Sequence, residues 1–218
     1  HTSSVSAFLL NRSSDLFTFL RLLAETQIPK VFLDTSSLVS PDELNGDLLL
    51  MESRNSVRNI TVHLLEKGCT LPGFMGDIGY AQSNRERYEG FCQALMDAGK
   101  TPNPSLCLTT PLGIDSYREE IDSFLSSLSR MPDAFVCASD YVACILMQLL
   151  EKRGLRVPED VAVSGFDNNI EDLLAENLTT VQVFNEELGS RLALQILYRI
   201  KYPHTPHEVT NLESKVLY

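Results

Sequence analysis

Polar side chains follow several short apolar runs of this sequence, and their types suit ligand binding. They are Asp34, Asp77, Ser139, Asp140, Asp167 and Asn168. Arg87 lies one helical turn inside the segment that follows Asp77. A carboxylate accepts hydrogen bonds from two adjacent hydroxyls, and a guanidinium donates to one or two oxygens, with charge strengthening both kinds of bond. An arginine facing an aspartate across a cleft therefore suits a polyhydroxylated ligand such as a sugar or a nucleoside.

The spacing alone leaves a plainer interpretation open. An aspartate after a strand is commonly a turn former or a helix cap, and this applies to Asp34, Asp140 and Asp167. Asp140 can cap the helix that begins at Tyr141. Tyr80, which precedes the Arg87 helix, could stack on the apolar face of a sugar, but its position does not decide this.

The elements that position these residues alternate between strands and helices. Runs that are apolar on both faces, such as Ala134-Phe-Val-Cys137, indicate a parallel sheet covered by helices on both sides. In such a sheet ligands bind outside the carboxyl ends of the strands. Ser83-Asn-Arg-Glu86 reads as a capping box. The predicted strands are 5–10, 30–33, 47–51, 71–75, 106–109, 134–137, 161–165, 179–183 and 208–212, and the predicted helices are 16–23, 53–67, 84–98, 114–130, 141–153, 171–175 and 185–200.

Composition excludes several classes of protein. The 218 residues include 18 Lys and Arg against 29 Asp and Glu, a net charge of −11, with no basic run to attract nucleic acid. No apolar stretch approaches the roughly 18 residues of a membrane span. The five cysteines form no CxxC pair, which favours reduced thiols and the cytoplasm. The sequence shows no catalytic motif, metal-ligand cluster or cofactor loop, so we expect no enzyme, no metal and no cofactor.

Longer motifs resemble one known family. Residues 153–168, Arg-Gly-Leu-Arg-Val-Pro-Glu-Asp-Val-Ala-Val-Ser-Gly-Phe-Asp-Asn, together with residues 178–181 and 187–189, resemble the effector-binding core of LacI/GalR-family transcriptional regulators. Asn84-Arg-Glu-Arg-Tyr-Glu-Gly-Phe91 and Cys137-Ala-Ser-Asp-Tyr-Val-Ala143 look like two further segments of that family. The motifs occur in the expected order.

The resemblance implies an α/β fold of the periplasmic-binding-protein-like type I, with two doubly wound parallel-sheet lobes joined by three crossovers. We expect residues 1–77 and 183–205 in the N-terminal lobe, and 78–182 and 206–218 in the C-terminal lobe. The crossovers would lie near 77–80, 181–183 and 204–207. The family's DNA-binding helix-turn-helix does not match any part of this chain, and the N-terminal lobe is expected to be incomplete.

The resemblance also implies how the effector is held. Arg87 and Asp167 would be the main polar contacts, and Ser83 and Ser139 would be secondary ones. Ser139 stands where many sugar-responsive members carry asparagine, which alters one contact. We expect these two pairs to be joined in the effector site by Asp140, Tyr80 and Asp77.

The predicted function is that of the ligand-binding part of a bacterial transcriptional regulator, which senses a sugar or related compound bound between the lobes. DNA would be contacted only through a domain outside this chain, and the regulator would be a homodimer without membrane contact. The alternative is an exported solute-binding protein of a transport system, which would share the fold and an Arg/Asp pocket. Five unpaired cysteines disfavour that alternative, because export exposes thiols to oxidation.

Overall fold

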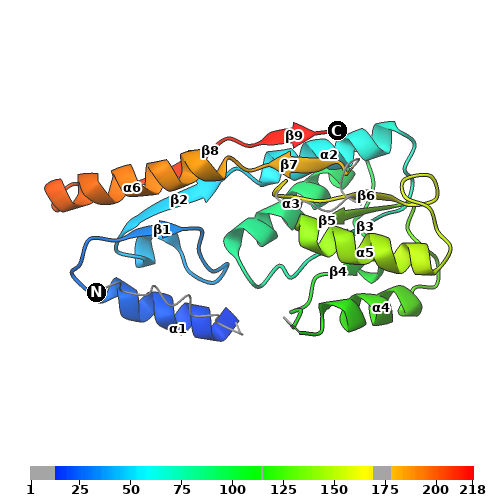
Figure 1. The fold of residues 1–218 in the computed structure, drawn as a ribbon, viewed down its shortest axis with the longest axis horizontal. Coiled ribbons are helices and arrows are strands. Elements are labelled where there is room, and N and C mark those ends of the chain that lie inside the picture. Colours follow the sequence, from blue (N-terminus) through cyan, green and yellow to red (C-terminus); the bar gives the residue numbers. More distant parts are fainter. Residues whose placement is uncertain (1–12, 114, 169–177) are drawn as a thin grey trace.

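The computed structural model describes residues 13–113, 115–168 and 178–218, which form two adjoining lobes (Figure 1). The N-terminal lobe is built on a parallel sheet of order β1-β2-β8, formed by Val31–Leu33, Asp47–Met51 and Val209–Leu212. Helices α1 (Ser13–Ala24) and α6 (Asn185–Lys201) lie beside this sheet. A short 3-10 helix, η1, is formed by Pro41–Glu43.

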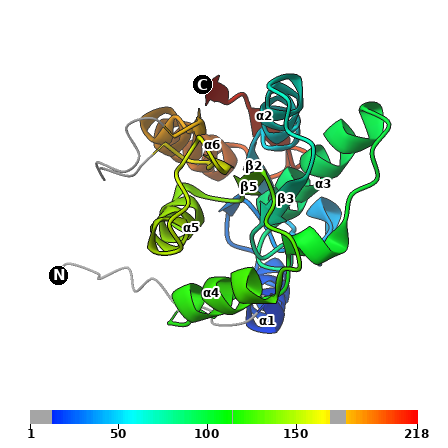
Figure 2. The same ribbon diagram turned by 90° about the vertical axis from the view of Figure 1, so that its right-hand side faces the viewer.

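The C-terminal lobe is built on a parallel sheet of order β4-β3-β5-β6. These strands are Cys107–Leu108, Pro72–Met75, Ala134–Cys137 and Ala162–Ser164, and the 3-10 helix η2 (Pro104–Leu106) leads into β4. Helices α2 (Arg54–Glu66) and α3 (Gln82–Asp97) lie on one side of the sheet, and α4 (Tyr117–Ser127) and α5 (Asp140–Lys152) lie on the other (Figure 2). Strands β7 (Thr180–Gln182) and β9 (Lys215–Leu217) form an antiparallel pair beside it.

Side chains that point alternately to the two faces of the C-terminal sheet form two layers of apolar core, one on each face. Phe74 and Val136 pack with Phe91 and neighbouring side chains of α2 and α3. The adjacent positions Met75 and Phe135 pack with α4 and α5 on the opposite face. Because successive strand residues point to opposite faces, continuous apolar runs such as 134–137 serve both layers.

The strand pairing places the lobe boundaries differently from the sequence-based expectation. β3 pairs with β5, and α2 packs against α3, so the C-terminal lobe already begins after β2 rather than at residue 78. β8 pairs with β2, so residues 209–212 belong to the N-terminal lobe rather than to the C-terminal one. In the described residues the chain therefore crosses between lobes at 52–53, 183–184 and 213–214. The sequence of a short apolar strand does not show which sheet the strand joins. For this reason the motif spacing misplaced two of these crossings.

The structure confirms the expected α/β architecture with parallel sheets, and all but two of the predicted elements are present within a few residues of their predicted bounds. Those two, the strand at 5–10 and the helical turn at 171–175, lie outside the described residues. The sequence analysis missed β9, a three-residue strand near the end of the chain. Across the described ranges, no helix has the length and apolar character needed to cross a membrane.

Candidate effector site

Arg87 lies at the carboxyl ends of the central strands, as the sequence predicted. It projects from α3, and its Nη1 donates hydrogen bonds to the carbonyl oxygen of Ala138, just beyond β5, and to Asn84 Oδ1. The guanidinium carbon lies 3.6 Å from the centre of the Phe166 ring, a cation–π arrangement. Its Nη2 is 3.7 Å from Asp167 Oδ1. One side chain of α3 therefore joins the ends of β5 and β6.

Arg87 is more enclosed than an open cleft would make it, since its side chain is only 9% exposed. Burial lowers the pKa of its guanidinium, while the nearby carboxylates, Asp167 first, act in the opposite direction. Arg87 Nε is buried and has no hydrogen-bond partner. The side chain contacts the buried Phe166 ring as well as polar groups at the sheet edge, so this burial is compatible with a role at the site.

Asp167, three residues beyond the end of β6, is held in an unusual backbone conformation. Its φ is 111° and that of Asn168 is 48°, and Asp and Asn tolerate the left-handed region better than most residues. Its amide donates to the carbonyl of Val181, and its own carbonyl accepts from Val183. Burial raises the pKa of Asp167 to about 6, with Arg87 lowering it and Asp140 raising it further. The carboxylate is therefore poised to lose its proton just below neutral pH.

Ser83 and Asp34 connect the two lobes. Ser83 Oγ donates to Asp34 Oδ2 at 2.6 Å, and the amides of Ser83 and Thr35 donate to Asp34 Oδ1. The amide of Gln82 also donates to the carbonyl of Thr35. Asp34, which the sequence analysis placed at the strand ends but not among the site residues, therefore anchors the first turn of α3.

The predicted capping box is wrong. Helix α3 begins at Gln82 with Ala81 as its N-cap, so Ser83 lies inside the helix and bonds Asp34 instead of its own backbone. Glu86 accepts a hydrogen bond from Gln82 Nε2. A carboxylate from the other lobe replaces the local cap, and no local pattern could reveal that.

Asp140 plays neither of its expected roles, and Ser139 caps the helix in its place. Ser139 is the N-cap of α5, and its side chain accepts from the amide of Val142, so the predicted cap at Asp140 is wrong. Asp140 is 2% exposed and accepts a hydrogen bond from Thr180 Oγ1 at 2.6 Å. A Cβ on Gly165 would lie 2.1 Å from Asp140 Oδ1, so glycine is needed for this approach. In this arrangement the Asp140 carboxylate is a buried support rather than a contact open to a ligand.

Three tyrosines gather near Asp77 on the rim of the C-terminal lobe. Tyr80 is 56% exposed, and the Tyr117 and Tyr141 rings meet edge to face at 5.7 Å. Burial raises the pKa of Tyr117, with smaller contributions from Asp77, Tyr80 and Tyr141 in the same direction. Asp77 itself accepts from the amide of Gly79 and so shapes the turn. The sequence analysis singled out Tyr80 and missed the other two, although each lies in the first turn of a helix that follows a strand.

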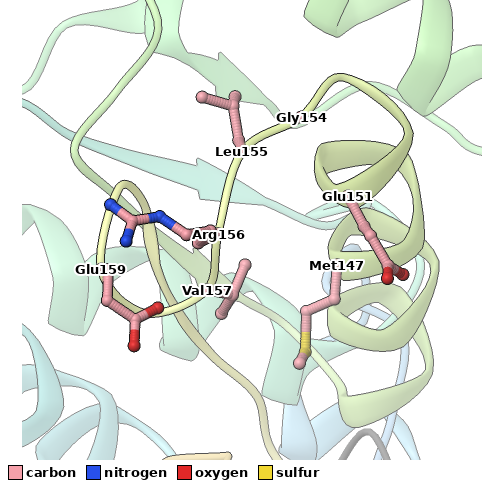
Figure 3. Close-up of a pocket in the computed structure, with 7 residues that line it drawn as sticks. All are labelled: Met147, Glu151, Gly154, Leu155, Arg156, Val157 and Glu159. Atoms are coloured by element: carbon pink, nitrogen blue, oxygen red, sulfur yellow. The ribbon is translucent and has the colours of Figure 1, made fainter.

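Two pockets lie apart from Arg87 and Asp167. One of about 430 Å³ is lined by both lobes, with Gln82 and Glu86 of α3 facing the segment 35–43. The other, of about 470 Å³, lies between α5 and the loop that follows it (Figure 3). It is lined by Met147, Glu151, Gly154, Leu155, Arg156, Val157 and Glu159. Neither contains the predicted main contacts, so neither defines the predicted effector site.

Within the described part of the chain, no group of three or more His, Cys, Asp or Glu side chains is placed to hold a metal ion. The five cysteines form no disulfide with one another. Burial raises the pKa of Cys107 to about 11, and burial together with Asp133 raises that of Cys69 to about 12. These thiols are therefore poor nucleophiles at neutral pH.

Comparison with known proteins identifies the relatives of this chain. Residues 61–217 match the family model described as a periplasmic binding protein-like domain. The HTH-type transcriptional repressor PurR of Aliivibrio fischeri is 30% identical over 213 residues, covering 96% of this chain and 62% of the relative. The HTH-type transcriptional regulator DegA of Bacillus subtilis is 31% identical over 182 residues, covering 82% of this chain and 51% of the relative. The chain thus spans little more than half the length of these curated relatives.

Solved structures agree on the fold. A LacI-type transcription regulator from Bifidobacterium animalis superposes with a TM-score of 0.75 at 22% identity, covering 89% of this chain and 72% of that one. A LacI-family regulator from Enterococcus faecium with bound ribose superposes with a TM-score of 0.70 at 21% identity, covering 94% and 83%. This chain therefore belongs to the periplasmic binding protein-like domain family, in the form of the effector-binding domain of LacI-family regulators.

Proposed function

We propose that this chain is the sensing part of a bacterial transcriptional regulator, and that a sugar or related polyhydroxylated molecule is its effector. The observation that carries the proposal is the position of Arg87 and Asp167, which meet at the carboxyl ends of the strands. The curated relatives described as repressors and regulators support the regulatory role. The related structures containing ribose or cellobiose support a sugar.

The chemistry of the pair fits such a ligand. Above about pH 6 the Asp167 carboxylate is ionised and accepts from two adjacent hydroxyls. Arg87 supplies donors, including the Nε that has no partner in the described structure. The exposed Tyr80 ring offers an apolar face on which a pyranose or furanose stacks. Ser139, which caps α5, lies at the same strand ends as a secondary contact.

The proposed mechanism is a shift of population between open and closed lobes. An effector that binds the closed arrangement more tightly than the open one moves the equilibrium by that difference in affinity. The Ser83–Asp34 contact between lobes forms one part of the closed arrangement. In the whole protein, a homodimer in the cytoplasm, the lobe rotation would alter DNA binding by a domain outside this chain. This regulator needs no cofactor and catalyses no reaction.

A thermal-shift panel of sugars, sugar phosphates and nucleobases tests the proposal on the wild type and on Arg87→Ala. A ligand at 100 times its dissociation constant stabilises the fold by roughly 2.7 kcal/mol. We expect one class of compound to raise the unfolding midpoint of the wild type and not that of the variant. Equal shifts in both proteins would place the effector elsewhere, and the absence of any shift would contradict a small-molecule effector of these classes.

The exported solute-binding protein remains the alternative function. It predicts the same ligand response, but a signal peptide instead of a DNA-binding segment in the sequence upstream. The two are separated by measuring whether the full-length protein retards DNA in an effector-dependent way. Effector binding without any DNA binding would favour the transport function.

A further inference from the structure

Lys30 is a buried cation at the amino end of β1. The residue is 8% exposed, and its Nζ donates to the carbonyl and the hydroxyl of Thr26 at 2.6 and 3.2 Å. Its aliphatic stem packs on Gly46, where an added Cβ would lie 3.0 Å from Lys30 Cβ. Among the residues described by the structure, no carboxylate forms an ion pair with it. A buried charge without a partner is unfavourable, so Lys30 calls for an explanation.

The nearest cluster of acidic and basic groups does not supply the missing anion. Asp47 is 1% exposed, and its carboxylate is bound by Arg199, by Gln195 and by the amide of Glu208. Arg199 uses its remaining N–H groups on the carbonyls of Thr205 and Pro206 and on the Thr205 hydroxyl. Asp47 therefore balances Arg199 and leaves the charge of Lys30 uncompensated.

A small pocket of about 100 Å³ opens beside Lys30. It lies where the amino ends of β1, β2 and β8 meet, on the edge of the N-terminal sheet opposite to the strand ends that face the other lobe. Its lining residues are Thr26, Gln27, Ile28, Pro29, Lys30, Asn45, Arg199, Pro203 and His207. The cations among them are Lys30 and Arg199, and His207 adds a third when it is protonated.

The donors of this pocket are held in place. Asn45 donates to the carbonyl of Ala24, and its side-chain oxygen lies 3.2 Å from His207 Nε2. His207 Nδ1 is 3.6 Å from Asp47 Oδ1. Lys30 has three N–H donors, and the contacts with Thr26 account for two of them. The third N–H of Lys30 is therefore left to bind an anion at this cationic pocket.

We propose that this pocket binds one small oxyanion, such as inorganic phosphate or sulfate, with Lys30 as its main partner. The volume is about three times the roughly 30 Å³ that a water molecule occupies in the liquid, and far below the roughly 300 Å³ at which sites for larger ligands begin. It therefore admits a single compact group and excludes a sugar. The bound anion would also fasten the segment 203–207, which connects α6 to β8, and this site is independent of the proposed effector site.

The experiment is a titration of the wild-type protein with phosphate, sulfate and chloride at constant ionic strength, followed by thermal unfolding. We expect phosphate or sulfate to raise the midpoint saturably, by on the order of 5 °C at 100 times the dissociation constant, and chloride to have no such effect. The absence of a saturable rise with either oxyanion would overturn the proposal.

Variants assign the binding to the pocket. Lys30→Met keeps the length of the buried stem and should weaken oxyanion binding at least tenfold, whereas Lys67→Met, at an exposed lysine, should leave it unchanged. His207→Gln, at a half-exposed side chain, is the second variant if Lys30→Met does not fold, and it should weaken binding severalfold. Undiminished binding by the folded Lys30 variant, or by His207→Gln in its place, would show that the anion binds elsewhere.

Discussion

Replacing Asp167 by asparagine should stabilise the ligand-free protein while destroying its proposed function. Burial raises the pKa of Asp167 from 3.8 to about 6. Between these two values the folded chain still holds a proton that the unfolded chain has released, so the free energy of unfolding falls as the pH rises through this window. Above pH 6 the full cost is present, and a shift of about two pH units corresponds to about 3 kcal/mol at most. Asparagine resembles the protonated form and avoids this cost.

Thermal unfolding of the ligand-free proteins at pH 4.5 and pH 7.5 measures the effect. The midpoint of Asp167→Asn should exceed that of the wild type by up to roughly 6–12 °C at pH 7.5, and the difference should fall to about a third of that value at pH 4.5. Asp160→Asn is the control because it removes the same charge at a residue whose pKa Arg156 lowers to about 2. That control should not stabilise the protein. If Asp167→Asn unfolded at a lower temperature than the wild type at pH 7.5, attraction to Arg87 would outweigh the cost of burial, and the reasoning would be refuted.

Two further predictions concern the packing of the lobes. Gly90→Ala should lower the free energy of unfolding by about 1–3 kcal/mol, because its Cβ would lie 2.1 Å from the carbonyl oxygen of Arg54 in α2. Gly189→Ala is the control, because open space surrounds that glycine, and it should not lower stability. Urea unfolding measures both variants, and equal midpoints would contradict the close approach of α2 and α3. Arg199→Met should lower the free energy of unfolding by about 3–5 kcal/mol, because it leaves the carboxylate of Asp47 buried without its cationic partner. Adding Asp47→Asn to this variant should recover part of that loss. If Arg199→Met had the urea midpoint of the wild type, the ion pair would add nothing to stability.

The sequence was sufficient to predict the strand ends because their signals are local. A buried apolar run followed by a polar residue marks both the strand and the direction in which it ends, and Asp167 and Ser139 were found in this way. The motifs of the family then placed Arg87 beside Asp167, and their side chains are 3.7 Å apart in the structure. This signal, an apolar run followed by a polar residue, does not depend on which lobe the strand joins.

Features that depend on distant partners could not be predicted in the same way. Ser83 donates its hydrogen bond to Asp34, a carboxylate 49 residues earlier in the chain. The buried Asp140 accepts a hydrogen bond from Thr180, which also lies outside the local sequence pattern. The pairing of β8 with β2 joins segments separated by most of the chain. Lys30 is the first residue of the predicted strand 30–33, and its burial becomes visible only when the amino ends of three strands are brought together.

The most direct test of the central claim is a calorimetric titration of the full-length protein with the compound that emerges from the ligand panel. Wild type and Asp160→Asn should bind it with the same affinity, and Asp167→Asn should bind it at least a hundredfold more weakly at pH 7.5, because it loses a charged acceptor in a buried site. Undiminished binding by a folded Asp167→Asn protein would contradict the placement of the effector between Arg87 and Asp167.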